Sequence, residues 1–159
     1  MSRVAIIGTG FIGRAWAISF ARAGYEVMLW DQSAEAPAAA RDYIAGVLPD
    51  LDTNGLLNGH SQQTVLDRIK LAATIEAALD GVVHVQENTP EKLDVKIAVF
   101  SMLDEHAPKD AVIASSTSAL LPSAFTGHVA GRHRCLVVHP INPPYLVPLV
   151  EVVGGKQTD

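Results

Sequence analysis

Three glycines in the pattern G-x-G-x-x-G, at residues 8–13, constrain the fold of this chain more than any other feature. The apolar, β-branched run at 3–7 comes directly before them and is typical of a strand buried on both faces of a parallel sheet. Residues 11–23 follow with apolar side chains at helical spacing, and the run 26–30 indicates a second buried strand. The pattern therefore predicts a compact βαβ unit whose tight turn is formed by the glycines.

Glycines at this turn allow the backbone to approach a pyrophosphate, and the N-terminus of the following helix favours anions. Asp31 ends the second strand, where a carboxylate can accept both ribose hydroxyls of an adenosine and repel a 2′-phosphate. We therefore expect NAD as the cofactor, in preference to NADP. The alternative is a structural glycine turn beside a helix-capping Asp31. The loop residues predicted to contact the cofactor are Gly8, Gly10, Phe11, Ile12 and Gly13.

Strands and helices continue to alternate along the rest of the chain, which predicts a single α/β domain over 1–159. We expect helices over 33–48, 61–69, 75–79, 88–106 and 121–125, and a turn over 49–55. We expect further strands over 70–72, 81–86, 111–115, 135–139 and 149–153. The predicted fold is a Rossmann-type, doubly wound, mostly parallel sheet with a helical hairpin insertion over 33–69 and a C-terminal β-hairpin.

Composition narrows the class of protein. The 159 residues carry 17 acids and 12 bases, a formal charge of −5 with no basic run, which argues against nucleic acid and anionic membranes as partners. Cys135 is the only cysteine, which excludes an intrachain disulfide and a cysteine-rich metal site, and we expect no metal. The first apolar run is too short for a signal peptide, so a cytoplasmic location is expected.

Two polar clusters follow predicted strands, at the sheet edge where open α/β folds bind ligands. The hydroxyls of 115–118 could bind a substrate oxygen, although turn and capping roles are the alternative. His139 ends another strand and faces Glu151 if 135–139 and 149–153 form a hairpin. A carboxylate on one ring nitrogen makes the other a base for an alcohol proton, whereas a lone histidine is more often structural. The remaining five histidines have no comparable partner.

These motifs together resemble the L-3-hydroxyacyl-CoA dehydrogenase family, and the match covers essentially the whole chain as the N-terminal NAD-binding domain of that family. The matching segments are Gly8-x-Gly10-x-x-Gly13 with Asp31-Gln32, Val85-Gln86-Glu87 with Glu91 and Lys96, Ala114 to Ser118, and His139-x-x-Asn142 with Glu151. The resemblance implies an NAD-dependent oxidoreductase that oxidises a 3-hydroxyl to a 3-keto group.

By this resemblance His139 would be the general base, Glu151 would orient it and Ser118 would hydrogen-bond the substrate hydroxyl. It also implies further contacts with the cofactor, from Gln32, Glu87, Glu91, Lys96, Ser116 and Asn142. Without the family, Glu91 is equally a first-turn helix acid and Lys96 a solvated helix residue.

The insertion over 33–69 is not strongly basic, whereas acyl-CoA members of the family use lysines there against the CoA phosphates. The segments 142–151 and 120–123 look closer to the lambda-crystallin or L-gulonate 3-dehydrogenase branch and to carnitine dehydrogenases. We therefore expect a small 3-hydroxy acid such as L-gulonate as substrate, with 3-hydroxyacyl-CoA as the alternative.

Members of this family carry a C-terminal helical domain that closes the substrate pocket and builds a homodimer. We expect that domain as the partner of this chain, which should bind NAD but have little activity alone. The competing interpretation is a catalytically idle NAD-binding sensor or a crystallin-like structural module. A 6-phosphogluconate-type dehydrogenase would match the glycine pattern but not the cluster around His139.

Overall fold

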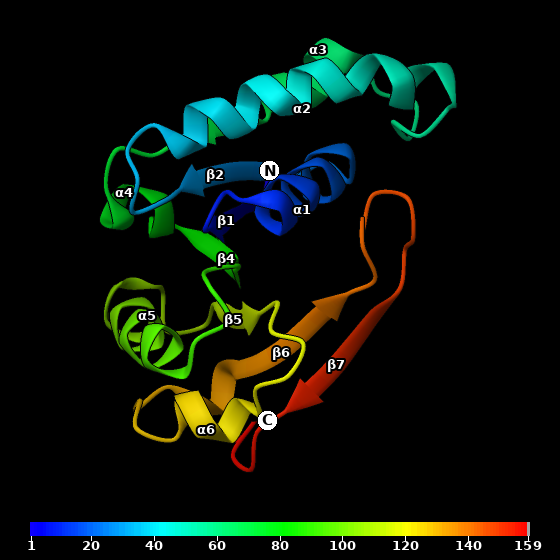
Figure 1. The fold of residues 1–159 in the computed structure, drawn as a ribbon. Coiled ribbons are helices and arrows are strands. Elements are labelled where there is room, and N and C mark those ends of the chain that lie inside the picture. Colours follow the sequence, from blue (N-terminus) through cyan, green and yellow to red (C-terminus); the bar gives the residue numbers. More distant parts are fainter. Residues whose placement is uncertain (159) are drawn as a thin grey trace.

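A seven-stranded sheet forms the centre of the molecule, in the order β3-β2-β1-β4-β5-β6-β7. Figure 1 shows this sheet from β2 to β7. The computed structural model describes residues 1–158. The strands are β1 (Arg3–Ile7), β2 (Glu26–Trp30), β3 (Ile69–Leu71), β4 (Val82–Glu87), β5 (Val112–Ser115), β6 (Cys135–Pro140) and β7 (Val150–Gly154). The helices are α1 (Phe11–Arg22), α2 (Ala36–Thr53), α3 (Gln62–Asp67), α4 (Ile75–Leu79), α5 (Leu93–His106) and α6 (Pro122–Thr126), with a 3₁₀ turn at Arg132–Arg134.

The first six strands in sequence pair in parallel, and only β7 runs antiparallel, against β6. The sheet grows from β1 through β2 to β3 on one side and from β1 through β4 to β6 on the other. This reversal of strand order leaves a crevice beyond the carboxyl ends of β1 and β4. The predicted Rossmann-type sheet and its C-terminal hairpin are confirmed.

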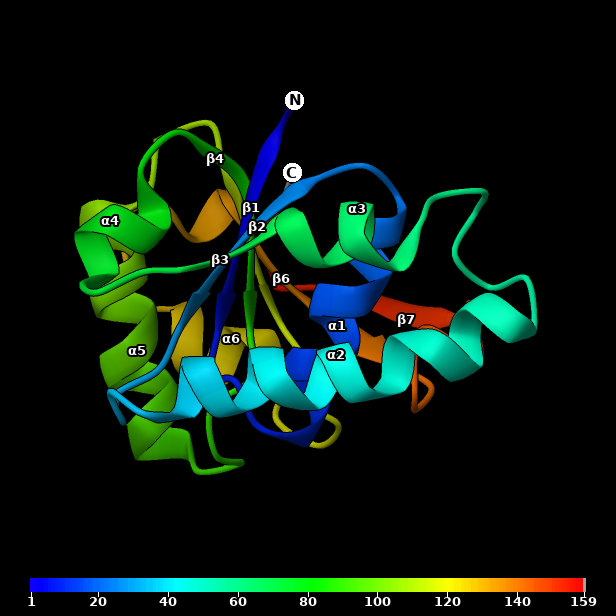
Figure 2. The same cartoon turned by 90° about the horizontal axis from the view of Figure 1, so that it is seen from above.

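Helices cover both faces of the sheet, as Figure 2 shows from above. Helices α1, α2 and α3 lie on one face, and α4, α5 and α6 lie on the other. Each face buries its own apolar cluster, because parallel strands covered on both sides carry apolar residues in both directions. The first cluster includes Val4, Ile6, Trp16, Leu29, Ile44 and Val65. The second includes Ile7, Leu79, Val85, Phe100, Ile113 and Phe125.

The glycine loop needs glycine at two positions for steric reasons. Gly8 has φ of +85°, and a Cβ on it would lie 2.8 Å from the carbonyl carbon of Asn88 at the end of β4. A Cβ on Gly13 would lie only 2.0 Å from the carbonyl oxygen of Gly8, so Gly13 lets α1 pack directly on the end of β1. A Cβ on Gly10 would meet nothing within 4 Å, which leaves free space beside the loop.

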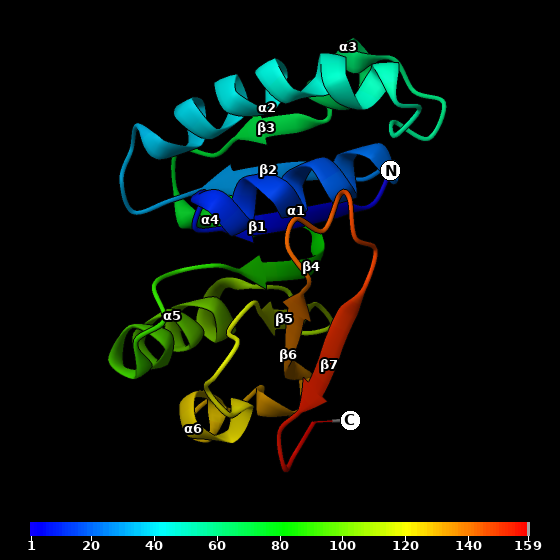
Figure 3. The same ribbon diagram turned by 45° about the vertical axis from the view of Figure 1, so that its right-hand side comes forward.

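The C-terminal hairpin pairs β7 along its whole length with β6. His139 on β6 is paired directly with Glu151 on β7. The loop between these strands curls back towards α1, as Figure 3 shows. Tyr145 in this loop packs against the apolar cluster under α1 and α2, so the loop is anchored to the opposite half of the sheet.

The structure corrects several predicted boundaries. The turn predicted at 49–55 is wrong over 49–53, because α2 continues through Pro49 to Thr53. Proline removes one helical hydrogen bond, but Leu48 and Leu51 on either side of it are buried in the core and hold the helix together. The helix predicted from 88 begins only at Leu93. Residues 88–92 form an irregular loop, in which the Asn88 amide donates to the carbonyl of Ile7 at 2.7 Å.

Two short elements also shift. The helix predicted over 61–69 ends at Asp67, and the strand predicted over 70–72 begins at Ile69, which is buried and pairs with Val27 of β2. Within residues 1–158, none of the helices combines the length and the apolar character needed to cross a lipid bilayer.

Gly13→Ala tests the close packing of α1 on β1. We expect it to lower the free energy of unfolding by about 1–3 kcal/mol, because the new methyl group would clash with the backbone of Gly8, which cannot easily move aside. Gly46→Ala is the matched control, since Gly46 is exposed within α2 with open space around it. It should stabilise the chain by about 0.5–1 kcal/mol. Urea unfolding of both variants measures the difference, and equal stabilities would contradict this account.

Candidate active site

Two adjoining clefts lie at the carboxyl ends of the parallel strands. The larger has a volume of about 940 Å³ and is lined by Gly8, Gly10, Trp30, Asp31, Gln32, Ser33, Asn88, Thr89, Pro90, Val95, Ala98, Val99 and Met102. The smaller has a volume of about 250 Å³ and is lined by Ile12, Asn88, Thr89, Glu91, Lys96, Ser116, Ser118, His139 and Asn142. Asn88 and Thr89 line both clefts, so the two form a continuous site around the end of β4.

Asp31 closes the glycine loop from the end of β2. Its Oδ2 accepts from the backbone amide of Thr9 at 2.7 Å and from the Thr9 hydroxyl at 3.2 Å, and its Oδ1 accepts from the amide of Ser33 at 3.1 Å. Each carboxylate oxygen has two lone pairs, so Oδ2 is fully used and Oδ1 keeps one acceptor position for a hydroxyl donor of a ligand. Asp31 is thus held in place in the lining of the larger cleft, with one acceptor position on Oδ1 left over.

The opposite wall of the larger cleft is apolar. Val95, Val99 and Met102 lie on α5 at i, i+4 and i+7 and line the cleft together. Sequence reasoning missed this wall, although three apolar residues at helical spacing were a signal for it. A cleft with a carboxylate on one side and an apolar wall on the other suits a nucleoside, whose base is flat and whose ribose offers hydroxyls.

The residues of the glycine loop serve two purposes: some line a cleft, and Gly13 allows close packing. Gly10 lines the larger cleft beside free space, and the first amides of α1 have no partners within the helix. Ile12 lines the smaller cleft. Gly13 lines neither cleft and acts through packing, while the side chain of Phe11 is exposed beside the loop. Gly8 and Gly10 thus border space in which an anionic group can meet backbone N–H donors.

His139 and Glu151 form a hydrogen-bonded pair at the smaller cleft. The Nδ1 of His139 lies 2.8 Å from Oε2 of Glu151, and the two residues are direct cross-strand partners. The histidine side chain is 22% exposed and the glutamate side chain 67% exposed. With Nδ1 engaged by the carboxylate, Nε2 is the ring nitrogen free to accept a proton. The predicted hairpin therefore does bring the two residues together.

Ser118 and Asn142 line the same cleft as His139. Ser118 is exposed, and its backbone amide donates to Oε1 of Glu91 at 3.1 Å, so the serine loop is attached to the start of α5. Asn142 is exposed in the loop that follows β6. An imidazole and an amide from the end of β6 and its loop, and a hydroxyl from the serine loop, therefore converge on one small cleft.

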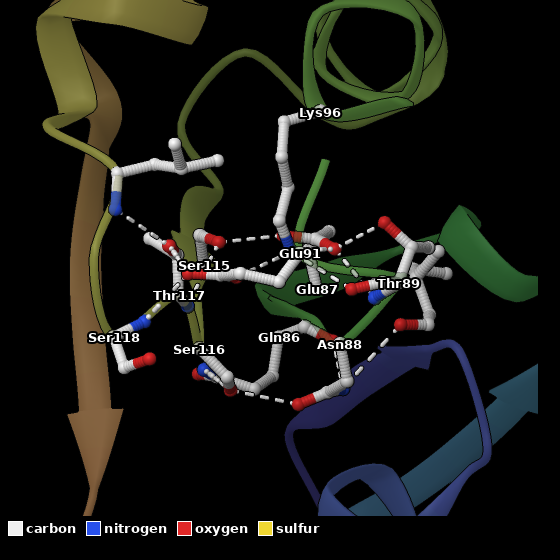
Figure 4. A network of polar contacts seen from close by, with 12 residues as sticks. Gln86, Glu87, Asn88, Thr89, Glu91, Lys96, Ser115, Ser116, Thr117 and Ser118 are labelled. Carbon is white, nitrogen blue, oxygen red and sulfur yellow. Dashed lines mark hydrogen bonds and ion pairs between the residues drawn. The ribbon is translucent and has the colours of Figure 1, made fainter. Parts of the chain in front are cut away.

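Glu91 connects the loop after β4 to the serine loop (Figure 4). Its Oε1 accepts from the Thr117 hydroxyl and from the amides of Ser118 and Ala119. Partial burial acts to raise the pKa of Glu91, but these hydrogen bonds and the charge of Lys96 outweigh it, so the pKa lies below its ordinary value. Glu91 is consequently a carboxylate acceptor at neutral pH.

Lys96 and Glu87 form a buried ion pair behind the cleft. The Nζ of Lys96 donates to both oxygens of Glu87 at 2.8 and 2.9 Å and to the carbonyl of Thr89 at 2.9 Å. Ser115 donates to the other side of the Glu87 carboxylate at 2.6 Å. Lys96 is 1% exposed and Glu87 has no exposed surface. Figure 4 shows this pair holding α5 against the ends of β4 and β5.

The predicted cofactor contacts therefore fall into two groups in the structure. The residues of this set that line a cleft are Gly8, Gly10, Ile12, Asp31, Gln32, Glu91, Lys96, Ser116 and Asn142, whereas Phe11, Gly13 and Glu87 line neither. Glu87 lines neither cleft and supports Lys96, Thr89 and Ser115 from below. Lys96 and Ser116 border the smaller cleft, but their polar atoms are already engaged by protein groups.

Sequence reasoning does not identify Asn88 and Thr89 as site residues, because the pattern at 88–91 predicts the start of a helix. Their position directly after a buried strand was the available signal. Among residues 1–158, no three His, Cys, Asp or Glu side chains gather closely enough to hold a metal ion.

Comparison with known proteins shows that residues 3–159 match the family described as 3-hydroxyacyl-CoA dehydrogenase, NAD binding domain. The chain is 45% identical over 156 residues to L-carnitine dehydrogenase of Streptomyces griseus, covering 98% of this chain and 45% of that protein. It is 39% identical over 156 residues to lambda-crystallin of Oryctolagus cuniculus, covering 98% and 49%. The chain thus spans about half the length of the curated relatives that it matches.

Solved structures agree with this match. The 3-hydroxybutyryl-CoA dehydrogenase from Escherichia coli K12 superposes with a TM-score of 0.92 at 33% identity, covering 99% of this chain and 33% of that one. A diketoreductase superposes with a TM-score of 0.91 at 28% identity, covering 100% and 56%.

Lys96→Met tests the buried ion pair. We expect the free energy of unfolding to fall by about 3–5 kcal/mol, because a buried carboxylate remains at Glu87 without its cationic partner. Adding Glu87→Gln should recover much of the loss, since a neutral amide costs less to bury. Lys92→Met, at an exposed lysine one turn away, should change stability by less than about 0.5 kcal/mol. Chemical denaturation separates these cases; a small effect of Lys96→Met alone would refute the role of the pair.

His84 on β4 should make the stability of the chain depend on pH. Burial lowers the pKa of His84, although its hydrogen bond with Gln86 acts in the opposite direction. The unfolded state therefore binds this proton more readily. The stability that neutral His84 contributes is fully present above its unfolded pKa of about 6.5. This stability is lost as the pH falls from there towards the folded pKa.

We expect His84→Gln to flatten the stability profile below about pH 6.5. His133→Gln, at an exposed histidine, is the control and should leave the slope unchanged. Urea titrations at a series of pH values from 7.5 to 5 measure both. An unchanged slope in His84→Gln would show that another group is responsible.

Proposed function

The chain belongs to the 3-hydroxyacyl-CoA dehydrogenase family as its NAD-binding domain, and we propose that it carries the proton-transfer half of an NAD-dependent oxidation of a 3-hydroxyl group. The cofactor is NAD. The observation that carries the proposal is the His139–Glu151 pair at a small cleft that adjoins the nucleotide cleft. A base is needed at this place because the alcohol must lose its proton as its carbon is oxidised.

The residues of the larger cleft fit NAD. Asp31 has acceptor capacity left for the adenosine ribose, and its charge disfavours a 2′-phosphate. Gly10 borders free space in front of unpartnered helix amides, where the pyrophosphate would be held. When bound, the nicotinamide ring supplies the hydride acceptor. Asn142, Glu91 and the segment after Glu87 would hold the ribose and nicotinamide side.

The chain's own groups move the proton. Glu151 holds the Nδ1–H tautomer of His139, so the lone pair of Nε2 faces away from the carboxylate and can take the hydroxyl proton. Glu151 also stabilises the charged ring once the proton has arrived. Ser118 would hydrogen-bond the substrate hydroxyl and fix its oxygen relative to the base. These three residues are the proposed catalytic group.

A small 3-hydroxy acid is the proposed substrate. Helix α2 has no lysine, and its single base, Arg41, donates from Nε to the carbonyl of Ile69. The same helix carries three acids, Asp42, Asp50 and Asp52, so its surface disfavours the phosphates of CoA. Relatives named L-carnitine dehydrogenase and lambda-crystallin support this branch. We propose an acid of the size of L-gulonate or L-carnitine.

We also propose that the substrate side is completed by a further, helical domain and that the complete protein is a homodimer. The greater length of the curated relatives supports the extra domain. The isolated 159-residue chain would then bind NAD but turn over slowly, and supplying the second domain in trans should raise the rate.

His139→Gln in the full-length protein tests the base. We expect kcat to fall by about 10²–10⁴-fold, because the general base is lost. The Kd for NAD should be unchanged, because His139 does not line the larger cleft. His106→Gln, at an exposed histidine on α5, is the matched control and should keep full activity. The assay follows NADH formation with L-gulonate, L-carnitine and a 3-hydroxyacyl-CoA.

The three substrates also distinguish the alternatives. Selective oxidation of the acyl-CoA would reject the small acid. Tight binding of NAD with no turnover of any substrate would favour the idle sensor or crystallin-like module. Normal turnover by His139→Gln would remove His139 from the mechanism.

A further inference from the structure

A second polar network lies on the face of β4 opposite the buried ion pair, and its centre is the hydroxyl of Ser116. This hydroxyl accepts from the indole Nε1 of Trp16 at 3.0 Å and from Nε2 of Gln86 at 2.8 Å, and it donates to Oδ1 of Asn88 at 2.7 Å. A serine hydroxyl has one proton to donate and two acceptor positions. The hydrogen-bonding capacity of Ser116 is therefore used completely within the protein.

The directions of these bonds follow from the chemistry of the partners. An indole N–H can only donate, so Ser116 must accept from Trp16. The side-chain oxygen Oε1 of Gln86 lies 3.0 Å from Nε2 of His84, so the side-chain NH₂ of Gln86 faces Ser116. The proton of Ser116 is then left for Asn88. Each group in the network has one consistent role.

Gln86 links this network to the base. Its NH₂ also donates to the carbonyl of Val138 at 3.2 Å, and Val138 directly precedes His139. The register between β5 and β6 ends at Ser115 and Val137, so β5 supplies no further partner to β6 beyond that point. Gln86 therefore reaches from β4 to the part of β6 that β5 no longer supports. It has no exposed surface.

The network joins α1, the loop after β4, the serine loop and the end of β6. Asn88 lies in both clefts, and its Nδ2 donates to the carbonyl of Gln86 at 2.9 Å. Ser116 begins the loop that contains Ser118, and Trp16 belongs to the helix that follows the glycine loop. Figure 4 shows Gln86, Ser116 and Asn88 together beneath the serine loop.

From this arrangement we infer that Gln86 and Ser116 are positioning residues for His139. They set the end of β6, and with it the histidine, relative to the loop at Asn88 and to Ser118. This inference rests on the proposed function, and it assigns Ser116 a role other than direct contact with NAD. A displacement of about 1 Å in a catalytic group can cost about 10²-fold in rate, so a small shift of Val138 is enough to matter.

Gln86→Met and Ser116→Ala in the full-length protein test this inference. Both remove hydrogen bonds at nearly constant shape, and we expect kcat to fall by about 10–100-fold. The Kd for NAD should stay within about threefold, because Asp31 and the glycine loop are untouched. Ser116→Thr keeps the hydroxyl and should restore most of the rate lost in Ser116→Ala.

Thr126→Val is the matched control. Thr126 is buried and donates to the carbonyl of Pro122 at 2.9 Å on α6, so the variant removes one buried hydrogen bond outside both clefts. It should lower the melting temperature without lowering kcat. If Gln86→Met and Ser116→Ala behave like Thr126→Val, the network is only structural. If they weaken NAD binding in parallel with kcat, the residues serve the cofactor site instead.

A spectroscopic readout separates this inference from the proposed function. The ¹⁵N resonances of the His139 ring report whether Nδ1 carries the proton donated to Glu151, and they can be recorded with NAD bound and without turnover. We expect a single Nδ1–H tautomer in the wild type and in Thr126→Val, and a mixture in Gln86→Met. A wild type that oxidises none of the substrates refutes the proposed function. Unchanged ring resonances and unchanged kcat in Gln86→Met refute the positioning role.

Discussion

The ends of β1 and β4 are in backbone contact, and the other groups of the candidate site are placed relative to this contact. Gly8 lies so close to Asn88 that no side chain fits between them, and the amide of Asn88 donates to the carbonyl of Ile7 at 2.7 Å. The nucleotide loop and the loop after β4 are therefore held directly against each other. Because Asn88 and Thr89 border both clefts, this contact also determines how the nucleotide cleft meets the cleft of His139.

Two neighbouring residues of β4, next to this contact, form buried polar networks on opposite faces of the sheet. Successive side chains of a strand point to opposite sides, so Glu87 faces α5 and Gln86 faces α1. Glu87 binds Lys96 and Ser115, and Gln86 binds Ser116 and the carbonyl of Val138. Both side chains are fully buried. Buried polar groups are costly unless they are satisfied, so each network favours one arrangement of the loops over all others.

Much of the fold could be predicted from the sequence, because strands and helices of a parallel sheet have strong local signals. The buried apolar runs, the glycine pattern and the spacing from His139 to Glu151 each indicated the correct element or pairing. The boundary at Pro49 was wrong because burial of Leu48 and Leu51 outweighs the local effect of proline. The predicted start of α5 was wrong because Asn88 bonds to the end of β1 and Glu91 bonds to the serine loop after β5.

The sequence by itself determined the fold class, the glycine loop with its acid at Asp31, and the facing positions of His139 and Glu151. These features depend on periodicity and on short sequence motifs, so residues that are close together in the chain determine them. Only the tertiary structure decided that Lys96 turns inward to Glu87, that α5 forms an apolar wall, and that the hydroxyl of Ser116 is committed to Trp16, Gln86 and Asn88. Such contacts depend on strand order and on which helix packs over which strand, and no local pattern specifies them.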